Sequence, residues 1–164
     1  MATYLCLDDA TKITGYSIFT DNKLKHYGVV NSEIKENKPF KRMKIMVDKI
    51  KGLIKKYKPD YVAIENCQFQ HNYETYKQLS QLQGMLILTF IEMGIPYIIV
   101  SPTTWKSFCK IKGRKREEQK ANTVKMIEDK FHLTVTEDEA DSIGIGLYAV
   151  NYIKNGGILN EKYD

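Results

Sequence analysis

The sequence predicts an α/β fold in which a mixed five-stranded sheet is flanked by helices. Three short β-rich segments come first, and the brief connections between them favour an antiparallel meander. Helical segments then alternate with short apolar segments, a pattern typical of β/α crossovers. The predicted order is β-β-β-α-β-α-β-α-α. The 164 residues contain no internal repeat and no linker, so we expect a single domain over residues 1–164.

Five segments are predicted to be strands, because they are short, apolar and rich in β-branched and aromatic residues. TYLCLD (3–8), TGYSIFT (14–20) and LKHYGVVNS (24–32) form the meander, and DNK is one of its turns. PDYVAIE (59–65) and PYIIV (96–100) each begin with a proline. The first and fourth of these strands end in an acidic residue.

Helices are predicted where apolar residues recur every three or four positions. The first covers 39–57, and a long second helix covers 73–93 and is closed by a glycine. A short helix begins near 102–105, another covers 117–130, and the last covers 137–154 and ends at NGG. These helices supply the crossovers and cover the sheet.

The composition, 43% hydrophobic and 27% charged, is typical of a soluble globular protein. No apolar run approaches the ~20 residues that a membrane helix needs. The amino terminus MATYLCLDDATK carries an acidic pair where a secretory signal needs a basic start. Cys6, Cys67 and Cys109 are odd in number and far apart, which suits neither a disulfide framework nor a zinc site. We therefore expect a cytoplasmic protein with reduced thiols.

The net charge of +5 is unevenly distributed along the chain. Ten of the 25 basic residues fall between Lys35 and Lys58, and we interpret most of them as the solvated face of a helix. Seven more fall between Lys106 and Lys120, in WKSFCKIKGRKREEQK, which contains a glycine and lies between predicted elements. This second run is predicted to be a basic loop that faces a nucleic-acid substrate.

Two predicted central strands end in a carboxylate. Asp8 follows YLCL, and Glu65 follows YVAI. Ligands of α/β sheets gather at the carboxyl ends of the strands. If the two strands are neighbours, the two carboxylates face each other across a short gap, and such close anions need a cation.

A third acidic group begins the last predicted helix, in TEDEADSIGIGLYAV. A solvated helix start explains Glu137 and Glu139, because Thr136 can be the N-cap and Glu139 then completes a capping box. It explains Asp141 poorly, since Asp141 lies one turn inside a helix that continues apolar nearly all round. Asp138, three residues earlier, shares the helix face of Asp141. This pair is the candidate for function.

The same helix contains Gly144 and Gly146, which are unfavourable inside a helix and indicate close approach of another element. Hard oxygen ligands from two strand ends and one helix face suit Mg²⁺ or Mn²⁺ better than zinc. Two such ions about 3.5–4 Å apart are the usual arrangement for in-line phosphodiester cleavage. Together with the basic run, the acidic residues indicate a metal-dependent nuclease.

These motifs resemble the RuvC-like Holliday-junction resolvases of the ribonuclease H-like superfamily. LCLDDATKITGYSIF is similar to that family's first strand, in which an Asp is followed by a small-residue turn and by Thr-Gly-Tyr. VAIEN is similar to its second acidic motif, and DEADSIGIG to its closing pattern of two acids and an apolar helix. LSQLQGMLILTFIEMGIPYIIVSPTTWK resembles its long helix, strand and basic segment. The resemblance spans nearly the whole chain, with the motifs in order.

The resemblance implies a ribonuclease H-like fold and two Mg²⁺ or Mn²⁺ ions in each active site. It places Lys106 and Lys120 near the scissile phosphate. It also implies a homodimer that acts on four-way junctions and is joined through the helix of residues 73–93. The implied catalytic and metal-binding carboxylates are Asp8, Glu65, Asp138 and Asp141.

The sequence departs from the family pattern at three places. An Asp-Ala pair replaces the usual Pro-Gly after Asp8, and we expect its acid, Asp9, to point away from Asp8 and to be peripheral. The segment KIKGRKREEQK is a few residues longer than its counterpart, which affects the match at Lys120. A glutamine stands where the family often has an aromatic that stacks on a base, so Phe69, Tyr73 or neither takes that role.

Other polar and aromatic residues are interpreted from their positions. His71 lies in a predicted loop and is interpreted as a bystander, and Trp105, the only tryptophan, as a core residue. Further DNA contacts are expected from Lys12, Phe69, Arg114 and Lys115.

The sequence therefore predicts a structure-selective DNA endonuclease that makes paired nicks in four-way junctions during recombination, repair or phage DNA processing. One alternative is a nuclease of the same fold with broader action on branched DNA or RNA–DNA hybrids. Others are a non-catalytic junction-binding protein and a small actin-like phosphotransferase, although a second Gly-rich phosphate loop is missing. A chain rich in Lys, Ile, Asn and Tyr is typical of an AT-rich genome and suits a bacteriophage or its prokaryotic host.

Overall fold

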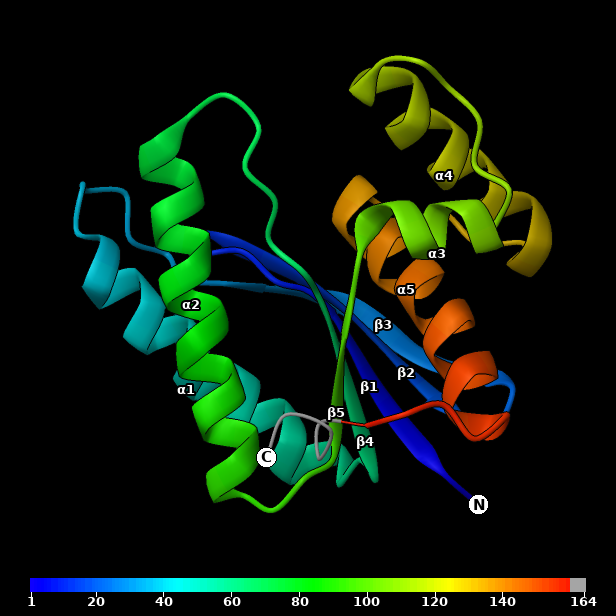
Figure 1. Cartoon of the computed structure of the whole chain (residues 1–164), viewed down its shortest axis with the longest axis horizontal. Coiled ribbons are helices and arrows are strands. Elements are labelled where there is room, and N and C mark those ends of the chain that lie inside the picture. Colours follow the sequence, from blue (N-terminus) through cyan, green and yellow to red (C-terminus); the bar gives the residue numbers. More distant parts are fainter. Residues whose placement is uncertain (160–164) are drawn as a thin grey trace.

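A five-stranded sheet runs through the centre of the molecule and carries helices on both faces (Figure 1). The structure is a computed structural model and describes residues 1–159. The strands are β1 (Thr3–Asp8), β2 (Ile13–Thr20), β3 (Lys23–Asn31), β4 (Tyr61–Glu65) and β5 (Tyr97–Val100). The helices are α1 (Pro39–Tyr57), α2 (Tyr73–Glu92), α3 (Pro102–Phe108), α4 (Arg116–Phe131) and α5 (Glu137–Lys154).

The strand order in the sheet is β3-β2-β1-β4-β5. Strands β1, β2 and β3 form an antiparallel meander, whereas β4 pairs with β1 and β5 with β4 in parallel. The predicted mixed sheet is confirmed, and the observed ends differ from the predicted ones by no more than two residues. The predicted order gave two helices after the last strand, whereas three follow β5, because the short helix α3 is separate from α4. Because β1 and β4 are parallel neighbours, their carboxyl ends meet at one edge of the sheet.

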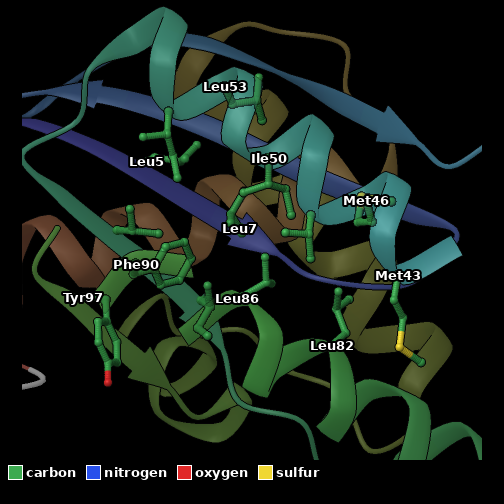
Figure 2. Packing of buried hydrophobic residues seen from close by; sticks show 14 of the residues in the cluster. Leu5, Leu7, Met43, Met46, Ile50, Leu53, Leu82, Leu86, Phe90 and Tyr97 are labelled. Atoms are coloured by element: carbon green, nitrogen blue, oxygen red, sulfur yellow. The ribbon is translucent and has the colours of Figure 1, made fainter. Parts of the chain in front are cut away.

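Alternation along β1 divides its side chains between two hydrophobic cores. Leu5 and Leu7 are fully buried on the face covered by α1 and α2, where Figure 2 shows them beneath the side chains of both helices. Tyr4 and Cys6 face the opposite core, with Ala63 of β4 and the apolar side chains of α3, α4 and α5. Both sheet faces are therefore covered, as expected for central strands of a mixed sheet.

Helix α1 is amphipathic, which explains the first basic run. Most of its lysines lie on the exposed face, as predicted. Arg42 is the exception, because it is buried and donates hydrogen bonds to the carbonyl oxygen of Glu36 and to Oε1 of Gln78, each at 3.1 Å. The buried apolar side chains recur at helical spacing (Figure 2): Met43, Met46, Val47, Ile50, Leu53 and Ile54.

Helix α5 packs unusually close to the rest of the molecule, as its glycines predicted. A Cβ atom on Gly144 would lie 2.5 Å from Cζ3 of Trp105, and one on Gly146 would lie 2.3 Å from Cε2 of Phe19. The hydroxyl of Ser17 in β2 also donates a buried hydrogen bond of 2.7 Å to the carbonyl oxygen of Ser142. These contacts fix α5 along the face of the sheet that carries Tyr4, Cys6 and Asp8.

Two simpler predictions can also be compared with the structure. The cysteines Cys6, Cys67 and Cys109 are free thiols. Over residues 1–159, helices fall short of the length and apolar character that crossing a membrane requires.

Candidate active site

Two of the predicted carboxylates lie side by side at the end of the sheet. Cys6 of β1 is opposite Ala63 of the parallel strand β4, so two residues later Asp8 and Glu65 end the two strands at the same edge. Alternation also places both of them on the side of the sheet that faces α5. The predicted convergence of these two strand ends is therefore observed.

The other two carboxylates come from the first turns of α5. Thr136 is the N-cap, and it forms the predicted capping box with Glu139, with N···O distances of 3.2 and 2.9 Å. Gly15 pairs with Asp8 across β2, and a Cβ atom on Gly15 would lie 2.0 Å from the carbonyl oxygen of Asp138. The absence of a side chain at Gly15 thus lets the first turn of α5 approach Asp8.

These elements enclose a cleft of about 940 Å³. One wall is the segment that follows β4, and the opposite wall includes α3 and the start of α4. Among the residues that line the cleft are all four predicted carboxylates and four basic residues of the second run: Asp8, Glu65, Asp138, Asp141, Lys106, Arg114, Arg116 and Lys120.

Burial and mutual repulsion make the carboxylates hard to ionise together. Burial raises the pKa of Asp8 well above its usual range, and the charges of Glu65, Asp141, Asp9 and Asp138 raise it further. Burial is also the largest cause of the raised pKa of Glu65 and of Asp141. The site therefore concentrates negative charge that a bound cation would relieve.

Two lysines of the basic run partly offset this charge. Nζ of Lys120 lies 3.7 Å from Oδ2 of Asp141 and 3.7 Å from Oε2 of Glu137. Nζ of Lys106 donates a hydrogen bond of 3.2 Å to Oε1 of Gln119 in α4. Both lysines lower the pKa of Asp141 against the effect of burial. Both lysines thus lie beside the carboxylates, and their contact with a scissile phosphate stays a prediction.

Asp9 is not peripheral, which corrects the expectation from the sequence. It lines the cleft, and its Oδ1 accepts a hydrogen bond of 3.0 Å from the backbone N–H of Glu65. Burial, and then the charge of Glu65, raise the pKa of Asp9 to about 8. The prediction was wrong because strand alternation does not continue past the end of β1 at Asp8.

Trp105 was interpreted only as a core residue, and it is fully buried. Its indole Nε1–H also donates a hydrogen bond of 2.7 Å to Oε2 of Glu65. No signal in the sequence links these two residues, which are 40 positions apart. Only the pairing of β4 with β5 brings α3 over the end of β4.

Of the remaining predicted DNA contacts, some line the cleft and others lie outside it. Arg114 lines the cleft, and its backbone N–H is held by Oε2 of Glu118 at 3.0 Å. Phe69 is 59% exposed and its ring packs edge-on against Tyr76, with centroids 5.7 Å apart. Three of the predicted contacts lie outside the set of residues that line the cleft: Lys12, Phe69 and Lys115. Their role in DNA binding stays a prediction.

The sequence did not single out a contact that spans the cleft. Nη1 of Arg116, at the start of α4, donates a hydrogen bond of 3.1 Å to Oε1 of Gln70, in the segment after β4. Both residues line the cleft, and both are exposed. Arg116 belongs to the second basic run, which was predicted to face DNA, whereas no feature of the sequence indicated a role for Gln70.

The donor set fits a hard divalent cation. The four carboxylates supply only oxygen ligands. Burial is the largest cause of the raised pKa of Asp8, Glu65 and Asp141, and a bound cation would counter it by favouring their ionised forms. Within residues 1–159, however, His, Cys, Asp and Glu side chains do not form a group of three or more with the geometry of a ready metal centre. The carboxylates thus offer the oxygen ligands that a divalent cation prefers, without forming a metal-binding group in this structure.

Two solved structures share the fold of this chain. The chain superimposes on "T. thermophilus RuvC in complex with Holliday junction substrate" with a TM-score of 0.76 and 17% identity, over 94% of this chain and 96% of that one. It superimposes on the Fowlpox virus resolvase, in a complex with Holliday junction DNA, with a TM-score of 0.67 and 16% identity, over 92% and 98% of the two chains. The ribonuclease H-like fold class is thereby confirmed.

Sequence comparison gives the family. A crossover junction endodeoxyribonuclease RuvC from Thermosipho melanesiensis is 27% identical over 143 residues, which are 85% of this chain and 90% of that protein. The RuvC of Finegoldia magna is 29% identical over 147 residues, or 87% and 89% of the two chains. The family model described as "Crossover junction endodeoxyribonuclease RuvC" matches residues 4–148. The chain therefore belongs to the RuvC family of crossover junction endodeoxyribonucleases.

Proposed function

We propose that the chain is a structure-selective DNA endonuclease that resolves four-way junctions by paired nicks and depends on Mg²⁺ or Mn²⁺. The observation that carries this proposal is the convergence of four carboxylates from β1, β4 and α5 in one cleft whose rim is basic. Membership of the RuvC family supports the type of reaction, and two neighbours of the same fold are complexes with Holliday junction DNA.

The four carboxylates would hold metal from two sides of the site. Asp8 and Glu65 stand on the sheet, while Asp138 and Asp141 stand on the helix that packs against Gly15. Two divalent ions held by these four side chains would supply Lewis acids for in-line hydrolysis of a phosphodiester.

The protein's own cations would bind the DNA backbone. Lys106 and Lys120 lie within the cleft, beside the carboxylates, so a phosphate placed over the carboxylates would meet both. Arg114 lines the same cleft and would add a third cation. Opening the hydrogen bond between Arg116 and Gln70 would free a further guanidinium for the backbone.

Paired nicks require two active sites, and α2 offers a surface for a second copy. Leu88 and Ile91 lie three residues apart on this helix and are 55% and 50% exposed. Gly84, on the same helix face, has no atom within 4 Å of the position of a Cβ, so a second helix can approach it closely. These features support a homodimer joined through α2.

Replacing both Leu88 and Ile91 with Glu is expected to convert the dimer to a monomer, because four carboxylates would then be buried in each symmetric contact. Sedimentation equilibrium measures the mass. The matched control is Phe40→Glu, at a 66% exposed position on α1, which should leave the dimer intact. A double variant that remains dimeric would refute the α2 interface.

The decisive assay of function compares synthetic substrates with the same arm sequences. We expect fastest cleavage of a four-way junction, with symmetric nicks in opposite strands, and none without a divalent metal. Equal rates on a replication fork or an RNA–DNA hybrid would instead indicate the broader nuclease. Tight junction binding with no cleavage under any metal would indicate a non-catalytic binding protein.

A further inference from the structure

The only tryptophan of the chain directs its one polar atom at a predicted metal ligand. Trp105 lies in the short helix α3 and has no solvent-exposed surface. Its Nε1–H donates a hydrogen bond of 2.7 Å to Oε2 of Glu65. A buried indole N–H needs an acceptor, and here that acceptor is a carboxylate of the active site.

The indole of Trp105 contacts helix α5 as well as Glu65. Its outer edge rests on Gly144, where a Cβ would come within 2.5 Å of Cζ3. Gly144 lies three residues after Asp141 in α5, so the ring sits one turn from a second predicted metal ligand. Trp105 thereby fixes the position of Glu65 relative to that of Asp141.

The fold brings α3 over Glu65 by a short route. Glu65 pairs with Val100, the last residue of β5, and α3 begins two residues later at Pro102. The backbone N–H of Glu65 is held by Asp9 at 3.0 Å, and its carboxylate by Trp105. The backbone and the side chain of Glu65 are therefore each hydrogen-bonded to a residue outside β4.

Such a restraint matters most for Glu65. Its side chain has three rotatable bonds, more than that of any aspartate in the site, and it ends among carboxylates of the same charge. Without a donor it would turn away from Asp8 and Asp141 into the cleft, because repulsion favours separation. The indole donor holds one carboxylate oxygen and leaves the other, Oε1, for a cation.

We propose that Trp105 is a positioning residue that holds the Glu65 carboxylate in the orientation that binds a divalent cation, and that its fluorescence reports occupancy of the site. This inference rests on the proposed function, in which Glu65 is a metal ligand. Hydrogen-bond partners of metal ligands change metal affinity by about 10- to 100-fold when they are removed.

The test replaces the donor while preserving the ring. In Trp105→Phe an aromatic ring remains but the N–H is lost. Because Trp105 is the only tryptophan, benzothienylalanine, in which sulfur replaces the indole N–H, can be incorporated at this position alone. Calorimetric titration of the DNA-free protein with Mn²⁺ should show a dissociation constant raised by about tenfold or more in both variants.

The matched control is Phe108→Leu, in the same helix. Phe108 is 44% exposed and packs edge-on against Tyr148, outside the residues that line the cleft. This variant should bind Mn²⁺ as the natural protein does. In the natural protein, Mg²⁺ should change the tryptophan emission with the same midpoint as calorimetry gives for Mg²⁺.

The outcomes separate the two proposals. If the natural protein binds neither Mn²⁺ nor Mg²⁺, the proposed function fails together with this inference. If it binds metal and both Trp105 variants bind equally well, Trp105 is only a core residue, while the proposed function stands. Should Trp105→Phe fail to fold, the benzothienylalanine protein, which preserves the shape of the side chain, decides the question. An emission that does not respond to saturating Mg²⁺ refutes the reporter role.

Discussion

Replacing Asp8 with Asn is expected to lower the rate of junction cleavage by about 1,000-fold or more, which corresponds to a barrier higher by about 4 kcal/mol. Asp8 ends the central strand β1, and the charges of Glu65, Asp138 and Asp141 all act on it. An amide in its place keeps the size of the side chain but removes the charge that a divalent cation needs. Single-turnover cleavage of a labelled four-way junction measures the rate.

The same variant should be more stable than the natural protein when metal is absent. The pKa of Asp8 is raised by burial and by neighbouring charges, so its ionisation in the folded state is unfavourable. In the unfolded chain it ionises near pH 4. Folding free energy is therefore lost as the pH rises from about 4 through the raised pKa, and Asn avoids that loss. Urea unfolding with a chelator should show an advantage of Asp8→Asn that is larger at pH 8 than at pH 5.

These two measurements control each other. A variant that has lost cleavage yet resists urea better than the natural protein is folded, so its defect lies in the chemistry. Added Mg²⁺ should stabilise the natural protein more than the variant, since ligand binding stabilises only the state that binds it. Undiminished cleavage by Asp8→Asn would refute the proposed site, and so would a variant that is destabilised at pH 8.

Replacing Gly146 with Leu is expected to destabilise the fold by about 3 kcal/mol or more, because it overpacks the core. The Cβ alone would lie 2.3 Å from Cε2 of Phe19, a fully buried ring in β2. Neither the strand nor α5 can move away easily, since a buried hydrogen bond joins Ser17 to Ser142 between them. Urea unfolding measures the free energy.

The matched control is Gly52→Ala in α1. Gly52 is exposed, and no atom lies within 4 Å of the position of its Cβ. Alanine should stabilise this helix by about 0.5–1 kcal/mol. If Gly146→Leu unfolds at the same urea concentration as the natural protein, the close approach of α5 to β2 does not occur.

Local sequence patterns predicted the order of elements because each pattern is set by neighbouring residues. Short apolar runs in TYLCLD and PDYVAIE marked the central strands, and the capping box of Thr136 and Glu139 marked the start of α5. The four carboxylates were found in the same way, since each lies at the end of a predicted element. Family membership supports the proposed reaction, and the role of these residues in it stays a prediction.

Contacts between distant residues were beyond these patterns. Asp9 was expected to be peripheral, but the chain turns after Asp8 and brings its carboxylate to the N–H of Glu65. Trp105 was expected to be a core residue, and its position in the sequence could not reveal that Glu65 accepts the hydrogen bond of its indole N–H. Gln70 and Arg116 gave no sign of their contact across the cleft.

The sequence by itself thus determined the α/β order, the ends of the strands and the identity of the acidic residues, because hydrophobic periodicity and capping act over a few residues. Only the tertiary structure decided how close those acids come. That distance depends on the pairing of β1 with β4 and on the packing of α5 against Gly15, Trp105 and Phe19. Such contacts join residues as far apart in the chain as Phe19 and Gly146, and no local pattern encodes them.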